Sequence, residues 1–172
     1  MKRVLVPMDG SRPAESVLQR LTDVCDPGDE IVLISVALPP TRRRRGYRAG
    51  SIVRSLPSAP GVTTGGQTAG PDMPIFAETT SQAEQRQLDE LKDYLEHRAE
   101  ALRKRGYKVS TVVDIHDSPG KAIVAYAKTM RPTFIALPRR SRATAIRSAL
   151  FGSVASDLVR AGTAPILVYP PR

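Results

Sequence analysis

Cysteine, tryptophan and long apolar runs are scarce in this chain of 172 residues, and each absence excludes a class of site. The single cysteine, Cys25, excludes an intrachain disulfide and any metal site built from cysteines. There is no tryptophan and only 5% aromatic residues, which argues against base-stacking platforms. No apolar run approaches the roughly 20 residues of a membrane span, and the stretch before Asp9 is too short for a signal-peptide core. We therefore expect a cytoplasmic protein without membrane contact.

Positive charge is in excess and is concentrated in two segments. The chain has 26 Lys and Arg against 17 Asp and Glu, a net charge of +9. Residues 39–71 contain six arginines and no acid, and residues 131–172 contain seven arginines and one acid. Such segments favour phosphates, nucleic acid or acidic surfaces as ligands without choosing among them. The 41% of hydrophobic residues and 25% of charged residues are otherwise typical of a globular domain.

Apolar runs and helical periodicities alternate along the chain. Short apolar runs bounded by turn residues predict five strands, at residues 4–6, 30–37, 109–115, 133–137 and 165–169. Apolar stripes at helical spacing predict helices that begin near Ser11, Ser81, Ser118 and Ser148, with Ser118 as a cap. Buried strands that alternate with helices are typical of an α/β fold with a doubly wound, five-stranded parallel sheet.

The segment from Pro39 to Thr80 interrupts this alternation. Six of its 42 residues are Pro and six are Gly, and it has few large apolar side chains. We interpret it as an insertion without regular structure in a single domain that spans residues 1–172. Its arginines, Arg42 to Arg45, could form a weak nucleic-acid arm, but only Tyr47 offers stacking nearby. A solvated loop or lid is the simpler interpretation.

Several positions follow the ends of predicted strands. In open parallel sheets, ligands bind at the carboxyl ends of the strands, where the strand order reverses. Asp9 follows the first strand, Val36 lies at the end of the second, and the segment from Arg139 to Ser153 follows the fourth. We expect these positions to line one crevice. Asp9 has an equally good structural role as a cap of the first helix.

Three segments of the chain resemble the universal stress protein family. The segment KRVLVPMDGSRPAESVLQRL resembles the opening of the family's sequences. DIHDSPGKAIVAYAKTMRPTFIALP resembles their segment that leads to the fourth strand, and LFGSVASDLVRAGTAPILVYP resembles their closing segment. The likeness covers residues 1–38 and about 81–172. It implies a Rossmann-like, adenine nucleotide alpha hydrolase-like fold with helices on both faces, and a homodimer joined through the C-terminal strand.

The family's nucleotide-binding members carry the motif G-2x-G-9x-G-[ST] after the fourth strand. Gly152 and Ser153 match its end, whereas Arg139 and Arg142 stand at the first two glycine positions, and a frame shifted by one residue also lacks both glycines. Arginine does not freely adopt the positive φ of a tight phosphate loop, yet its guanidinium binds phosphate well. The resemblance implies ATP or another phosphorylated anion, held by Asp9, Val36, Arg139, Arg142, Gly152 and Ser153.

Three functional hypotheses follow. The first is a non-catalytic protein that binds ATP or another phosphorylated anion in the stress response. The second is a dimeric scaffold without nucleotide that contacts protein partners, and the third is a weak nucleic-acid binder that uses the arginine-rich insertion. His116 lies near Asp114 and Asp117 but lacks the spacing of a metal site. We therefore expect no metal. No base–nucleophile pair or carboxylate pair emerges from the sequence, so we also expect no enzymatic activity, although slow ATP hydrolysis is conceivable for the family.

Overall fold

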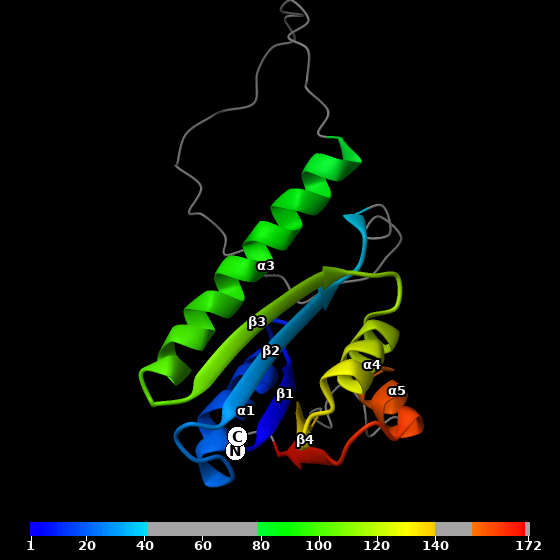
Figure 1. The fold of residues 1–172 in the computed structure, drawn as a ribbon. Coiled ribbons are helices and arrows are strands. Elements are labelled where there is room, and N and C mark those ends of the chain that lie inside the picture. Colours follow the sequence, from blue (N-terminus) through cyan, green and yellow to red (C-terminus); the bar gives the residue numbers. More distant parts are fainter. Residues whose placement is uncertain (41–78, 140–152, 171–172) are drawn as a thin grey trace, which may run out of the picture.

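The computed structural model describes residues 1–40, 79–139 and 153–170, which form a five-stranded sheet with helices on both faces (Figure 1). The strands are β1 (Arg3–Pro7), β2 (Glu30–Ala37), β3 (Lys108–Ile115), β4 (Phe134–Pro138) and β5 (Ile166–Tyr169). The helical elements are α1 (Arg12–Arg20), the 3-10 turn η1 (Leu21–Asp23), α3 (Thr80–Arg103), α4 (Pro119–Met130) and α5 (Ser153–Ala161).

The strand order is β3-β2-β1-β4-β5, and every neighbouring pair is parallel. The chain runs outward from β1 through β2 to β3, then returns to place β4 on the other side of β1. This reversal is the mark of a doubly wound sheet, so the predicted fold class is confirmed. It also fixes the switch point between β1 and β4.

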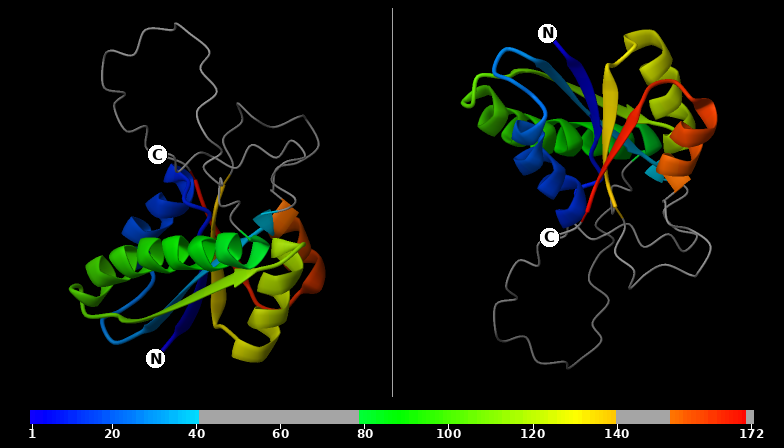
Figure 2. Two further views of the ribbon diagram at one scale, coloured as in Figure 1. Left: turned by 90° about the horizontal axis from the view of Figure 1, so that it is seen from above. Right: turned by 90° about the horizontal axis from the view of Figure 1, so that it is seen from below.

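Alternating side chains of the central strands bury two separate layers of helices. Val4 and Val6 of β1 pack in a cluster with residues of α1 and α3, whereas Leu5 packs with residues of α4 and α5. This division follows from the period of two along a strand. Figure 2 shows the resulting layers, with α4 and α5 next to each other and away from α3.

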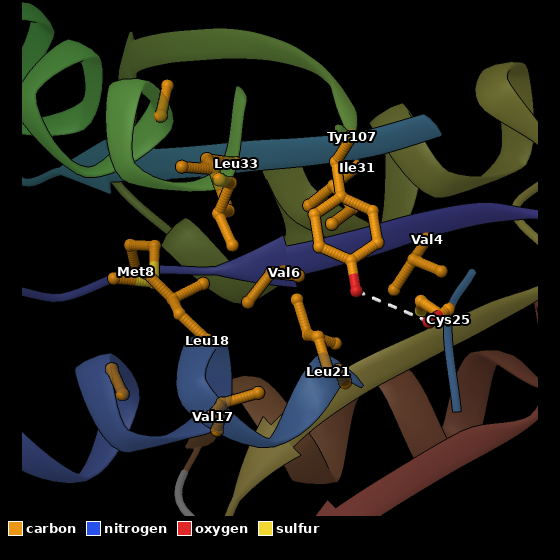
Figure 3. Close-up of a cluster of buried hydrophobic side chains, with 14 of the residues drawn as sticks. Val4, Val6, Met8, Val17, Leu18, Leu21, Cys25, Ile31, Leu33 and Tyr107 are labelled. Carbon is orange, nitrogen blue, oxygen red and sulfur yellow. Dashed lines mark hydrogen bonds between the residues drawn. The ribbon is translucent and has the colours of Figure 1, made fainter. Parts of the chain in front are cut away.

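The cluster under α1 and α3 also encloses the segment that joins η1 to β2 (Figure 3). There the hydroxyl of Tyr107 donates a hydrogen bond of 3.2 Å to the backbone oxygen of Cys25. The Cys25 side chain is buried, and its burial raises the pKa of the thiol to about 11. A reactive thiolate therefore does not form at this position near neutral pH.

The ends of the predicted elements need small corrections. The long helix begins at Thr80, with Thr79 as its cap, instead of at Ser81, because Thr79 and Gln82 form a reciprocal capping box. β3 begins one residue earlier than predicted, whereas β4 and β5 each begin one residue later. α5 is described from Ser153, and residues 148–152 of its predicted start lie outside the described residues, as do residues 41–78 of the predicted insertion.

The cap of α4 differs from the prediction in its chemistry. Ser118 occupies the N-cap position, and Pro119 follows it as expected, but the Ser118 side chain makes no capping hydrogen bond. Its backbone amide instead donates to Nδ1 of His116 at 2.9 Å. The imidazole of His116 thus holds the turn before α4, while Ser118 remains the N-cap without a side-chain bond.

Candidate functional site

The switch point lies where β1 and β4 turn to different partners. At their carboxyl ends, the amide of Met8 donates to the oxygen of Ile34 on β2 at 2.8 Å, while the amide of Arg139 donates to the oxygen of Tyr169 on β5 at 2.7 Å. The register between β1 and β4 themselves is recorded only at Val4 and Leu5, further back along the strands. The two strands therefore separate toward the edge where doubly wound folds hold their ligands.

Asp9 stands at this edge, two residues beyond β1, and its side chain is exposed. Its Oδ1 accepts a hydrogen bond of 3.0 Å from the amide of Ser11, and Gly10 between them takes a φ of 74°, which glycine adopts without strain. The side-chain cap of α1 is Ser11, which accepts from the amide of Ala14. Asp9 therefore orders the turn before α1 with one oxygen and keeps Oδ2 without a partner among the described residues.

Arg139 follows β4 and is half-buried. Its backbone amide is bound to Tyr169 and extends the pairing of β4 with β5. That amide is consequently occupied, and only the guanidinium is left to contact a ligand. This differs from a glycine loop, in which backbone amides themselves surround a phosphate.

Ser153 is the first residue of α5 and is exposed. In a parallel α/β unit the helix runs opposite to the strands, so the N-terminus of α5 lies at the same edge of the sheet as the carboxyl end of β4. The free amides of a helix N-terminus carry partial positive charge and favour anions. Arg142 and Gly152, the other two predicted residues of this motif, lie outside the described residues.

Val36 lies on β2, one strand away from the switch point. It pairs with Asp114 of β3, and its half-buried side chain packs on the α4–α5 side of the sheet. The next residue, Ala37, accepts a hydrogen bond of 2.9 Å from the amide of His116. The structure thus brings Asp9 and Arg139 to neighbouring strand ends and Ser153 to the same edge, while Val36 lies beside them on the adjoining strand.

A charged cluster joins α1 to α3 behind this edge. Oε1 of Glu15 accepts hydrogen bonds from Arg98 at 2.6 Å and from the hydroxyl of Tyr94 at 3.2 Å. Burial, reinforced by the charge of Glu15, raises the pKa of Tyr94 to about 12. Because Glu15 lies in the first turn of α1, the cluster fixes the helix that follows Asp9 and leaves the tyrosine protonated near neutral pH.

A groove of about 390 Å³ between α4 and α5 was not predicted from the sequence. Four charged side chains line it: Lys121, Lys128, Asp157 and Arg160. The two lysines are seven residues apart on α4, a spacing that places them on one helix face, but only the packing of α5 beside that face makes a groove.

The described residues offer neither a metal-binding cluster nor a membrane-spanning helix. In the ranges that the structure describes, no three His, Cys, Asp or Glu side chains are grouped to hold a metal ion. None of the described helices is long and apolar enough to cross a membrane.

Comparison with known proteins gives one family match and a set of similar folds. A model of the universal stress protein family matches residues 66–170, more than half of the chain. Among the curated proteins, none matches the chain significantly.

Solved structures cover nearly the whole chain at low identity. The hypothetical protein MJ0577, whose biochemical function was assigned from its structure, is 20% identical with a TM-score of 0.66, over 99% of this chain and 96% of its own. UspA from Lactobacillus plantarum is 17% identical with a TM-score of 0.61, over 99% and 97%. A universal stress protein family protein from Arabidopsis thaliana with AMP bound is 14% identical with a TM-score of 0.58, over 100% and 93%. These likenesses establish the shared fold.

Proposed function

The chain belongs to the universal stress protein family, and we propose that it is a non-catalytic binding protein of the stress response that holds ATP or another adenine nucleotide at its switch point. The observation that supports the proposal is the separation of β1 from β4 at the edge of the sheet where Asp9 and Arg139 follow neighbouring strands. The proposed binding residues are Asp9, Val36, Arg139, Arg142, Gly152 and Ser153.

Each group at the switch point fits a different part of a nucleotide. The unpartnered Oδ2 of Asp9 is a hydrogen-bond acceptor, as a ribose hydroxyl requires. The amides at the start of α5 and the guanidinium of Arg139 suit phosphate oxygens. Because the amide of Arg139 is bound to Tyr169, its contribution must come from the charged side chain. Binding should therefore be more sensitive to salt than binding in a backbone cradle.

Two structures with this fold support an adenine nucleotide as the ligand. The Arabidopsis protein has AMP bound, and a universal stress protein that is 14% identical to this chain was solved in complex with cAMP. ATP is the adenine nucleotide that we propose here, in a cytoplasmic protein of one domain spanning residues 1–172. We propose no resident metal and no catalytic residue. The proposal therefore makes no claim about slow ATP hydrolysis.

A dimeric scaffold without nucleotide is the second candidate. β5 is the edge strand of the sheet, so its outer backbone groups have no strand partner among the described residues. We propose that a second copy pairs with this edge, since an unpaired apolar strand favours such association. A monomeric mass by light scattering at micromolar concentration would contradict the dimer.

Calorimetric titration with ATP tests the nucleotide site. Replacing Arg139 and Arg142 together by Ala should weaken ATP binding by about tenfold or more, because charged hydrogen bonds contribute about 1.5–3 kcal/mol each. A matched control replaces Lys104 and Arg105, two exposed cations at the other end of the sheet, by Ala and should leave affinity unchanged.

Replacing the same two arginines by Gly separates the remaining outcomes. If the Gly pair loses binding as the Ala pair does, the arginines form the phosphate site. If the Gly pair binds ATP more tightly than the natural protein, the arginines obstruct a backbone site, and the natural chain is not an ATP protein. If no form binds ATP while the protein is a dimer, the scaffold hypothesis replaces the nucleotide proposal.

A further inference from the structure

Helices α4 and α5 lie side by side on one face of the sheet (Figures 1 and 2), and the groove is lined by residues of these two helices. Lys121 and Lys128 line it from α4, and Arg160 lines it from α5. The floor between them is aliphatic and includes Val124 and Ala161. An apolar floor between cations suits a ligand that has both apolar and anionic groups.

Among the described residues, no acid forms an ion pair with the three cations of this groove. Lys121, Lys128 and Arg160 are exposed, and none forms an ion pair with another residue in the described ranges. On the opposite face of the sheet, by contrast, Arg98 and Arg103 of α3 are each paired with a glutamate. The groove therefore has unpartnered positive charge as well as an apolar surface.

The groove's acid, Asp157, is turned toward the start of α4. A β-carbon placed on Gly120 would collide with Oδ2 of Asp157 and lie 2.9 Å from its Cγ, so the carboxylate lies directly against the first turn of α4. A carboxylate at a helix N-terminus is favourably placed, because that end carries partial positive charge. Lys128 and Arg160 lie at the other end of α4 and on the last turn of α5, and within residues 1–40, 79–139 and 153–170 no acid pairs with them.

We propose that this groove binds an acidic peptide segment of a partner protein, with an aliphatic side chain on the floor and carboxylates beside Lys121, Lys128 and Arg160. A single-stranded nucleic acid would gain from aromatic surfaces on which its bases stack, and the described residues that line the groove include none, whereas the apolar floor suits an aliphatic side chain. An anionic membrane suits a convex surface, whereas this surface is concave. A second copy, whose net charge is also +9, does not supply the excess of acids that these cations attract.

The test uses fluorescence anisotropy with the full chain and a labelled peptide of about twelve residues that combines Glu pairs with Leu. Binding should weaken as salt is added. Reversing all three cations (Lys121→Glu, Lys128→Glu and Arg160→Glu) should weaken binding at least about tenfold, since three attractive contacts become repulsive. The milder replacement of all three by Gln should give a smaller loss and serves if the reversed protein unfolds.

A matched control variant carries three charge reversals on the other face of the molecule. Lys92, Lys104 and Arg105 are exposed on α3 and just after it, and their reversal to Glu changes the net charge equally. If this control loses as much affinity as the groove variant, binding follows net charge and the proposal fails. A peptide with Ser in place of Leu should also bind more weakly, and equal binding would contradict the apolar floor.

Three other results would overturn the proposal. The first is no binding of the acidic peptide, and the second is binding of phosphatidylserine vesicles or single-stranded DNA, but not of the peptide, through the same cations. The third is competition between ATP and the peptide, or loss of peptide binding in Asp9→Asn. Either result would show that the peptide binds at the switch point and not in the groove. The residues that line the groove include none of those proposed for the nucleotide site, so failure of either proposal leaves the other standing.

Discussion

The close approach of α5 to α4 makes Gly120→Ala the sharpest test of the packing. Replacing a helical Gly by Ala ordinarily stabilises a helix by up to about 1 kcal/mol. Here the new β-carbon would collide with Oδ2 of Asp157 and lie 2.9 Å from its Cγ and 3.1 Å from its Cβ. Rotation of the carboxylate about the Cβ–Cγ bond moves only its oxygens and leaves Cγ at 2.9 Å, so relief requires the whole Asp157 side chain to change rotamer or α5 to shift. We expect a net destabilisation of about 1–3 kcal/mol, the cost of overpacking.

A double-mutant cycle with Asp157→Ala isolates this contact. Removing the carboxylate deletes Cγ and Oδ2 and leaves only the 3.1 Å approach of Cβ, so Gly120→Ala should cost little or become stabilising in that background. Urea unfolding of the four proteins measures the coupling free energy between the two substitutions. In thermal unfolding, a change of 1 kcal/mol in stability corresponds to about 2–4 °C in Tm for a chain of this size. The reasoning is refuted if Gly120→Ala stabilises the natural protein, or if it costs the same with and without Asp157.

Two more predictions concern the ends of elements. Asp29, which is 5% exposed, accepts hydrogen bonds from the amides of Lys2 and Asp26 at 2.7 and 3.0 Å, and these bonds hold its pKa below the usual value. Its carboxylate should therefore stabilise the fold above the unfolded pKa of about 3.9, and this contribution should disappear as pH falls through the lower folded value. Urea unfolding should show Asp29→Asn less stable than the natural protein at pH 6 but more nearly equal at pH 3, and a constant gap would contradict this. Thr79→Ala should remove the capping box with Gln82 at a cost of about 1 kcal/mol, measured as faster amide exchange in the first turn of α3, while unchanged exchange would show that the cap is dispensable.

The sequence predicted the sheet well because burial on both faces leaves a simple signal. Runs such as residues 30–37 are apolar almost throughout, and the observed strands match them within a residue or two at each end. The doubly wound parallel arrangement was also predicted, since strands that alternate with helices have few allowed arrangements. The start of α3 was missed by one residue because both Thr79 and Thr80 precede a plausible first turn, and the capping box selects Thr79.

The roles of short polar side chains at turns were harder to predict. Asp9 and Ser11 can each accept a hydrogen bond from nearby amides, and the sequence does not say which of them caps α1. In the structure Ser11 caps the helix and Asp9 binds the amide of Ser11. At α4 Ser118 is the N-cap as the sequence favoured, but its side chain makes no capping hydrogen bond, and its own amide donates to Nδ1 of His116. Such assignments depend on backbone angles that composition and spacing do not determine.

The net charge of +9 locates no ligand until the ion pairs are known. Arg3, Arg98 and Arg103 are among the charges counted, yet each lies within 2.7 Å of a glutamate and presents little charge for a partner. Lys121 and Lys128 count equally in the sequence, but no acid in the described ranges pairs with them. Composition therefore indicated the arginine-rich segments as the site of an anionic ligand. The ion pairs indicate α4 instead, a helix with two lysines and no acid. The unpaired cations, and not the total, decide where an acidic ligand is attracted.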